Sequence, residues 1–292
     1  MKENVKLGAF VGLTGLDMVY YQDCIPSENK KSKTNNYSML IGGPAANAAI
    51  TYALLGGRSI IISYIGDSDI GKMIKKELWE DYGVEVIDCA SGLTILPSIS
   101  SIAINLTTAT RTIWSGQQLI DKIDERYLND VIKKADFCLS DCNLSELALK
   151  ALSYAKQESK PIVLDAGSWK DNFELFLSVA DDAIASVDCK PLNYNNDFIV
   201  AANKCGVKNI AITNGGDSIK WKSENDNGII KPPIIEAKDT LGAGDVFHGA
   251  YCYFKFEKNL FFSESLAKAS EVAALSVKYI GPREGVMKYR RG

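Results

Sequence analysis

The segment "DTLGAGDVF" at residues 239–247 carries residue types suited to phosphate chemistry. Its Gly-Ala-Gly run, residues 242–244, has almost no side chain, and a helical pattern follows at once. Backbone N–H groups at the positive end of a helix bind anions. Asp245 lies in the predicted first turn, where a carboxylate either complements the helix dipole or accepts a proton from an attacking hydroxyl. This segment alone leaves both roles open.

A second segment, "IGGPAANAAITYALLGG" at 41–57, places a glycine pair before a helix of small residues. Gly42 and Gly43 precede the helix, and Asn47 falls in its first turn. This arrangement is typical of a tightly packed helix start. It is equally typical of a backbone that must approach a polyhydroxylated ligand, since an amide side chain can donate to and accept from neighbouring hydroxyls.

A third segment, "YIGDSDIGKM" at 64–73, nearly matches the phosphate-binding pattern G-x-x-x-x-G-K-[ST]. Met73 stands where a hydroxyl should bind Mg²⁺, so we expect a tight strand-to-helix turn instead. Asp67 or Asp69 would then lie near the helix entry or face a substrate cleft. The alternative, a P-loop NTPase, would make Lys72 central.

Composition excludes several classes of function. The 292 residues are 46% hydrophobic and 24% charged, with a net charge of -3. Basic residues do not cluster except in the final "KYRRG", so we expect no nucleic-acid partner. No stretch of about 18 consecutive apolar residues occurs, so we expect no membrane span.

Seven scattered cysteines without a C-x-x-C motif indicate reduced thiols and a cytoplasmic location. The one histidine, His248, is the only residue through which a zinc enzyme or a Ser-His-Asp hydrolase could operate. We expect this side chain to be buried and structural.

Short apolar runs alternate with helical patterns along most of the chain. This alternation predicts a parallel sheet covered by helices. Two ranges, 14–40 and 94–114, break the alternation, and we interpret them as a small β lid subdomain. The remaining ranges, 1–13, 41–93 and 115–292, would form the α/β core that binds nucleotide and substrate. The predicted strands are 5–13, 59–66, 135–141, 161–167, 182–187 and 209–213, and the clearest predicted helices are 45–57, 70–83, 144–157 and 265–281.

Together, the early Gly-Gly-x-x-x-Asn and the late Asp-Thr-x-Gly-Ala-Gly-Asp resemble the two signature motifs of the ribokinase-like (PfkB) carbohydrate kinase family. "GDSDIG", "ATRTI" at 109–113 and "ITNGGDS" at 212–218 are similar to further family segments. The resemblance implies a three-layer α/β/α core with a mostly parallel central sheet and a small β lid. "LDMVYYQDCIP", "TRTI" and "GAGDVFHGA" look closest to the ketohexokinase-like branch, and to bacterial sulfofructose kinases within it.

The resemblance implies transfer of the γ-phosphoryl group of ATP to a hydroxyl of a ketohexose or related sugar, with Mg²⁺ as cofactor. Asp245 would be the base, and Gly242, Ala243 and Gly244 the anion hole, while Asp17, Gly42, Gly43, Asn47 and Arg111 would bind the sugar. ATP would contact Ser186, Thr213, Gly215, Gly216, Gly242 and Gly244. Asp239 resembles part of a monovalent-cation loop, which implies K⁺. Lys30, Lys31 and Lys33 are either candidates for binding an anionic sugar or part of a solvated loop.

One departure from the family concerns the metal. Where many members carry Asn-x-x-Glu near the nucleotide, this chain has Ser186 and Cys189. Asp188 is the only acid nearby. Either Asp188 substitutes, or Mg²⁺ is held mainly by ATP phosphates and water, as is usual for this ion.

Alternatives to the sugar kinase remain at this stage. A nucleoside kinase of the same family would place a base under the lid, where Trp114 is the nearest aromatic residue. A non-catalytic sugar- or nucleotide-binding protein could retain the fold, although the intact Asp245 argues against it. The exposed edges of a β lid also predict a homodimer formed through the lid.

Overall fold

The structure is a computed structural model that describes residues 5–108, 110–116, 124 and 126–292. Residues 1–4, 109, 117–123 and 125 lie outside this description. They include Ala109 of the "ATRTI" segment and parts of the predicted core ranges 1–13 and 115–292.

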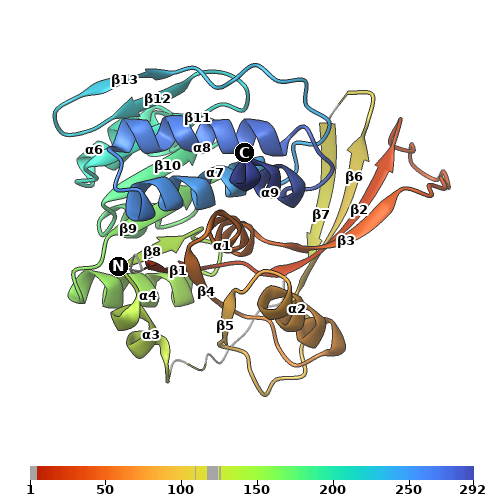
Figure 1. Cartoon of the computed structure of the whole chain (residues 1–292), viewed down its shortest axis with the longest axis horizontal. Coiled ribbons are helices and arrows are strands. Elements are labelled where there is room, and N and C mark those ends of the chain that lie inside the picture. Colours follow the sequence, from red (N-terminus) through yellow and green to blue (C-terminus); the bar gives the residue numbers. More distant parts are fainter. Residues whose placement is uncertain (1–4, 109, 117–123, 125) are drawn as a thin grey trace.

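The central sheet has nine strands in the described residues (Figure 1). From edge to edge the order is β13 (Asn227–Ile230), β12 (Ile219–Lys222), β11 (Asn209–Thr213), β10 (Asp182–Ser186), β9 (Ile162–Ala166), β8 (Phe137–Ser140), β1 (Leu7–Val11), β4 (Arg58–Ser63) and β5 (Glu85–Asp88). Pairing is parallel from β5 to β11, and β12 and β13 add an antiparallel edge. The predicted, mostly parallel sheet is confirmed.

Helices cover both faces of this sheet. In chain order they are α1 (Pro44–Leu55), α2 (Asp69–Glu80), α3 (Leu128–Lys134), α4 (Ser145–Gln157), α5 (Phe173–Leu177), α6 (Phe198–Lys204), α7 (Ala243–Cys252), α8 (Phe262–Ser276) and α9 (Arg283–Arg291). A single 3₁₀ turn, η1 (Leu192–Tyr194), precedes α6, and a π-helical turn, η2 (Tyr253–Glu257), extends α7.

Alternate residues of the strands enter two separate apolar cores. Phe10 and Leu139 pack with α1, α2, α7, α8 and α9, whereas Ala9 and Cys138 pack with α3 to α6. Strands buried on both faces carry nearly continuous apolar runs, which is why they were visible in the sequence. The three layers therefore correspond to the predicted α/β/α core.

The predicted helix 265–281 was wrong at both ends, since α8 spans Phe262–Ser276. The chain leaves the helix because the carbonyl of Val277 accepts from the amides of Lys238 and Asp239. Residues 277–282 instead form a bend, which brings the amide of Gly281 to the carboxylate of Asp239, 2.9 Å away.

A second, four-stranded sheet projects from one side of the core (Figure 1). Its order is β3 (Tyr37–Gly42), β2 (Gly15–Gln22), β6 (Ser98–Asn105) and β7 (Thr110–Gly116). β3 and β7 run two residues past the ranges that we predicted for a lid. β2, β3 and β6 alternate between more buried and more exposed residues, and the polar residues 23–36 between β2 and β3 hid this pattern in the first range. We call this sheet the small sheet.

One face of the small sheet is buried and the other is exposed. Val19, Tyr21, Ile102 and Ile104 form a small apolar core, against which Leu241 packs. Because Leu241 belongs to the loop that leads into α7, the small sheet rests directly on the predicted phosphate-binding segment.

Candidate active site

The Gly-Ala-Gly run forms the start of α7. Gly242 has a left-handed backbone with φ of 70°, which favours glycine, and a Cβ atom there would lie 3.2 Å from Cβ of Pro282. A Cβ atom on Gly244 would meet nothing within 4 Å. The first turn of a helix has N–H groups without intrahelical partners. This turn can therefore bind an anion. The amide of Ala243 makes a long hydrogen bond of 3.3 Å to the carbonyl of Thr240, which a bound anion would replace.

Asp245 lies in this first turn and is half-buried. Its Oδ2 accepts a hydrogen bond of 2.8 Å from the side-chain nitrogen, Nδ2, of Asn47, near the start of α1. Burial, together with the negative charges of Asp165 and Asp141, raises the pKa of Asp245 to about 8, and the Asn47 hydrogen bond opposes this rise. A carboxyl group with a pKa in this range is well matched to proton transfer near neutral pH.

Two buried carboxylates near Asp245 were not singled out in the sequence, Asp141 after β8 and Asp165 within β9. Asp141 accepts from the backbone amides of Leu13, Ala45 and Asn143 at 2.9, 3.0 and 2.9 Å. It thereby ties the end of β1 to the start of α1. The signal available was an acid at the end of an apolar strand, in "CLSD" and "IVLD", where the carboxyl ends of parallel strands meet.

His248 is buried, as predicted, with 4% of its surface exposed. Its Nδ1 lies 2.7 Å from the carbonyl of Gly244 and 3.3 Å from Oδ2 of Asp165, and its Nε2 lies 3.2 Å from the carbonyl of Ile184. The two carbonyl oxygens can only accept hydrogen bonds, and the same holds for the Asp165 carboxylate when it is ionised. His248 therefore connects the first turn of α7 to β9 and β10.

Of the residues predicted to hold the sugar, Asp17, Gly42, Gly43 and Asn47 lie around the start of α1, and Arg111 lies apart on β7. Burial raises the pKa of Asp17 on β2, while the Ser100 hydroxyl and the charge of Arg283 lower it. Gly42 leaves room for this carboxylate, since a Cβ atom on Gly42 would lie 2.2 Å from Cγ of Asp17. Gly43 has φ of 98°, and a Cβ there would lie 2.2 Å from the carbonyl of Leu13.

Arg111 reaches the phosphate-binding segment from β7. Its Nη1 donates to the hydroxyl of Thr240 at 3.0 Å, and the side chain remains exposed. Lys30, Lys31 and Lys33 are exposed in the connection between β2 and β3.

Four of the six residues predicted to contact ATP lie at or just after the carboxyl ends of β10 and β11, and the other two, Gly242 and Gly244, lie at the start of α7. Ser186 and Thr213 are paired across these strands, and the Thr213 hydroxyl donates to the carbonyl of Ala185 at 3.2 Å. Gly215 and Gly216 follow β11, and a Cβ atom on either would meet nothing within 4 Å. A nucleotide could approach this backbone closely.

The residues at the usual Asn-x-x-Glu positions do not fit a magnesium site. Burial raises the pKa of the Cys189 thiol to about 12, so this side chain is neutral. The amide of Asp188 donates to the hydroxyl of Ser186 at 3.2 Å. Within the described ranges, no group of three or more His, Cys, Asp or Glu side chains is arranged to hold a metal ion.

Asp239 is buried and fully engaged by the chain. Its Oδ1 accepts from the amide of Leu241 at 2.9 Å, and its Oδ2 accepts from the amide of Gly281 at 2.9 Å and the hydroxyl of Tyr21 at 3.4 Å. The carboxylate thus holds the small sheet, the α7 loop and the segment before α9 together.

The segment 66–73 forms a strand-to-helix turn. Ser68 caps α2 by accepting from the amide of Gly71 at 3.2 Å. Asp67 accepts from Lys75 and from the amide of Gly92, both at 2.6 Å, so its two oxygens are engaged within the turn. Lys72 is exposed and lies 3.9 Å from Asp69.

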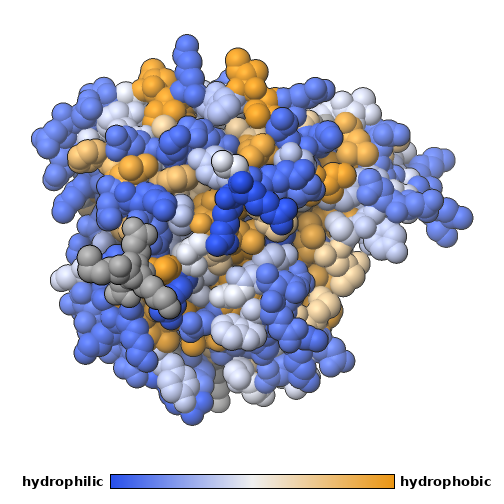
Figure 2. All heavy atoms as spheres, viewed as in Figure 1, coloured by the Kyte–Doolittle hydropathy of each residue, from blue (hydrophilic) through white to orange (hydrophobic). Residues whose placement is uncertain are grey.

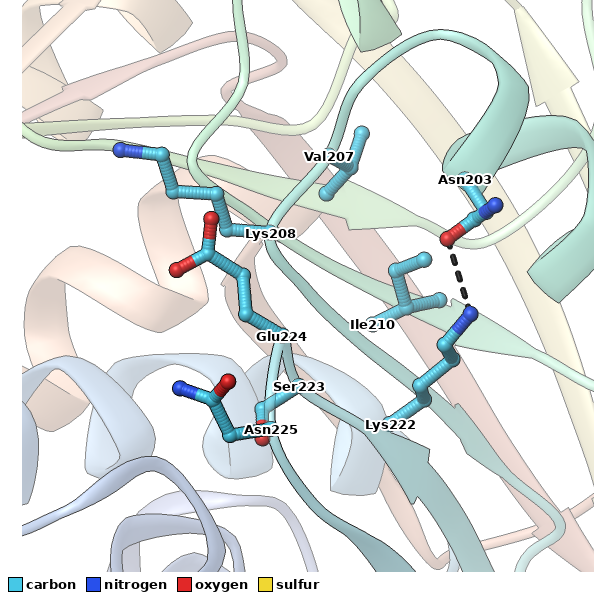
Figure 3. A pocket seen from close by; sticks show the side chains of 8 residues that line it. All are labelled: Asn203, Val207, Lys208, Ile210, Lys222, Ser223, Glu224 and Asn225. Atoms are coloured by element: carbon cyan, nitrogen blue, oxygen red, sulfur yellow. Dashed lines mark hydrogen bonds between the residues drawn. The ribbon is translucent and has the colours of Figure 1, made fainter.

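A surface hollow, drawn in Figure 3, lies elsewhere on the molecule. It is lined by Asn203, Val207, Lys208, Ile210, Lys222, Ser223, Glu224 and Asn225. Its residues come from the end of α6, the start of β11 and the turn after β12, and Lys222 donates to Asn203 at 2.9 Å. Because Thr213 ends β11, this hollow is at the opposite end of that strand from the candidate site.

Hydrophilic residues cover most of the face drawn in Figure 2. None of the helices in the described part of the chain has the length and apolar character needed to cross a bilayer.

Comparisons with known proteins agree with the motifs and the fold. A ribokinase of Dictyostelium discoideum is 24% identical over 320 residues, covering 99% of this chain and 98% of the relative. A putative ribokinase from Agrobacterium tumefaciens superposes with a TM-score of 0.81 at 22% identity, covering 99% of this chain and 98% of that one. An Arabidopsis thaliana ribokinase complexed with ribose and ATP gives a TM-score of 0.75 at 19% identity, covering 99% of each chain.

The sequence also matches the pfkB family carbohydrate kinase model over residues 1–288. The predicted class of enzyme, a phosphotransferase acting on a sugar hydroxyl, is thereby confirmed. The chain belongs to the pfkB family of carbohydrate kinases.

Proposed function

We propose that the protein transfers the γ-phosphoryl group of ATP to a hydroxyl of a ketohexose or related sugar. The observation that carries this proposal is the 2.8 Å hydrogen bond between Asn47 and Asp245. It joins the glycine pair and helix start suited to a polyhydroxylated ligand to the helix start suited to a phosphate. A hydroxyl held beside Asn47 would lie next to both a base and an anion site.

In this mechanism, Asp245 accepts the proton of the attacking hydroxyl. The sugar oxygen forms a bond to the γ-phosphorus while the bond from that phosphorus to the bridging oxygen of ATP breaks. ADP leaves with the bonding electrons, and the proton stays on Asp245. The backbone amides of Gly242, Ala243 and Gly244 would stabilise the charge on the transferring group, and each such donor is worth about 3 kcal/mol.

ATP would lie along the ends of β10 and β11, beside Ser186, Thr213, Gly215 and Gly216, with its phosphates directed to Gly242 and Gly244. When bound, Mg²⁺ would neutralise phosphate charge. Ser186 and Cys189 do not form a carboxylate site for it, so ATP and water would supply its ligands. A K⁺ requirement stays a prediction, because the Asp239 carboxylate already accepts three hydrogen bonds.

The small sheet favours a sugar over a nucleoside. Strand register places Asp17 and Ser100 on the buried face, and Arg111 shares that face. Trp114, which is paired with Ser101, lies on the opposite face and is 60% exposed. Trp114 therefore offers no stacking surface for a base on the buried face. That face instead carries polar groups suited to sugar hydroxyls.

The substrate can be identified with an assay that couples ADP release to NADH oxidation. We expect turnover with a ketohexose, a ketohexose phosphate or a ketohexose sulfonate. Because the relatives include ribokinases, ribose is the essential comparison, and turnover with ribose alone would move the assignment to a pentose kinase. Selective turnover of nucleosides would support the nucleoside kinase. If none of these compounds causes ADP release, a non-catalytic binding protein would be favoured.

We further propose a homodimer formed through the exposed face of the small sheet. This face carries Tyr20, Tyr37, Met39 and Trp114, with Tyr37 67%, Met39 53% and Trp114 60% exposed, while Met18 on the same face packs against the main core. An apolar sheet face of this kind is typical of a contact between copies. Light scattering should give twice the chain mass of 31.9 kDa, and Trp114→Glu should give the monomer. A wild-type monomer would contradict the proposal.

The cytoplasmic location stays a prediction from the cysteine pattern.

A further inference from the structure

Arg283, the first residue of α9, lies beneath the candidate site and is 9% exposed. Its Nη2 donates to the carbonyl of Ile41 at 2.6 Å and to Oδ1 of Asn47 at 3.3 Å. Its guanidinium carbon lies 5.4 Å from the centre of the Tyr82 ring. Arg283 therefore contacts both the strand before the glycine pair and the amide that donates to Asp245.

These contacts fix the orientation of the Asn47 amide. A guanidinium group can only donate, so the side of the amide that faces Arg283 must be the oxygen. The nitrogen is then directed at Asp245, where it donates at 2.8 Å. With the amide rotated by half a turn, an oxygen would face the carboxylate, and the two acceptors would repel each other.

Arg283 is costly to bury. Its Nε and Nη1 are buried and have no hydrogen-bond partner in the described part of the chain. Unpaired buried donors destabilise a fold, and contact with an aromatic face offsets only part of that cost. A side chain held in this way calls for an explanation other than stability.

We infer that Arg283 is a positioning residue, which holds the Asn47 amide so that it donates to Asp245, favours the ionised form of this base and aims it at the substrate hydroxyl. This inference rests on the proposed function, in which Asp245 is the base. The relay runs from α9 through α1 to α7 and uses a residue outside both signature motifs.

The surrounding charges define what the relay must oppose. Asp17 of β2, Asp141 after β8 and Asp165 of β9 all act on Asp245 and favour its protonated form, and His248 of α7 lies against Asp165. The charge of Arg283 also acts on Asp17 of β2, and on its other side Arg283 faces Glu77 and Tyr82 at the α2 end of the core. The Asn47 hydrogen bond is the main contact that favours the ionised form of Asp245.

The test compares kcat/KM against pH for Arg283→Gln and the wild type, with the sugar that the coupled assay identifies. We expect Arg283→Gln to lower kcat/KM about tenfold at neutral pH, and to move the acidic limb upward by about one pH unit. The KM for ATP should not change. Arg290→Gln is the matched control, because Arg290 lies on the same helix and donates to the carbonyl of Leu54 in α1 at 3.0 Å.

A double-mutant cycle with Asn47→Ala tests whether Arg283 acts through Asn47. Adding Arg283→Gln to Asn47→Ala should cause no further loss, because the amide is already absent. Arg283→Lys covers the case in which the glutamine variant fails to fold. It keeps a donor for Oδ1 of Asn47 and should keep the acidic limb where the wild type has it.

Additive losses in the cycle, or an acidic limb unmoved in Arg283→Gln, would overturn the relay. An equal loss of kcat/KM in Arg290→Gln would also overturn it, because the effect of Arg283 would then come only from the packing of α9. Asp245→Asn separates these failures from failure of the proposed function. If that variant retains turnover, the base is misassigned. If it is inactive while the cycle is additive, only the relay is wrong.

Discussion

Arg111, on β7 of the small sheet, donates from Nη1 to the hydroxyl of Thr240, 3.0 Å away, in the segment that leads into α7. The two residues are 129 positions apart. This contact, the packing of Leu241 on the small sheet and the hydrogen bond from Tyr21 to Asp239 link that sheet to the phosphate-binding turn. A movement of the small sheet would therefore displace the start of α7.

The first prediction concerns this link. Arg111→Gln should raise the KM for the sugar about tenfold and change kcat less, because an exposed side chain on the small sheet contributes to binding more than to the chemical step. Steady-state kinetics measures both. Thr240→Val is the matched control, since it removes the acceptor and leaves the guanidinium. Equal effects in the two variants would show that Arg111 only holds the loop and does not contact the substrate.

The second prediction concerns the base. Asp245→Asn should lower kcat about a thousandfold or more, because the amide cannot accept the hydroxyl proton. The amide has nearly the same shape, so ATP should still bind, as measured by calorimetry. Asp69→Asn, in the exposed first turn of α2, should retain wild-type turnover. Retained turnover in Asp245→Asn would contradict the proposed mechanism.

The sequence predicted six strands of the central sheet, β1, β4 and β8 to β11, and proposed the residues of the candidate site, but not the contacts between those residues. Asn47 and Asp245 belong to motifs that were visible, whereas their hydrogen bond depends on how α1 packs against α7. Arg283 lies in neither signature motif, and its role depends on a bend after α8 that the helical pattern over 265–281 did not reveal. Asp141 follows β8 and Asp165 is the next-to-last residue of β9, and only the parallel order β8–β9 brings them beside Asp245.

The third prediction uses the raised pKa of Asp245. A base must be ionised, so kcat/KM should fall as the pH drops below about 8. Stability should show the opposite trend. Folding raises the pKa of Asp245 from 3.8 to about 8, so between these values the folded state binds more protons than the unfolded state. This group therefore makes the fold less stable as the pH rises through that window.

The variant Asp245→Asn isolates this contribution, because its side chain is neutral at every pH. The stability of Asp245→Asn minus that of the wild type should be larger at pH 9 than at pH 5. Thermal melts of both proteins across this range measure the difference. A constant difference between the two melting temperatures would mean that folding does not raise the pKa of Asp245.

The last prediction separates the two lysines of the 66–75 region. Lys75 lies 2.6 Å from Asp67 and 2.8 Å from Asp88, and Asp88 also accepts from the amides of Ile65, Gly66 and Ala90. Lys75→Met should cost about 1–2 kcal/mol of unfolding free energy, since it leaves the largely buried Asp88 without its counter-charge. Lys72→Ala removes an exposed side chain and should change neither stability nor ATP affinity. Urea unfolding and ATP titration of the two variants measure these effects. A loss of ATP binding in Lys72→Ala would return the phosphate site to residues 66–73, because only a P-loop would place that ammonium on the nucleotide.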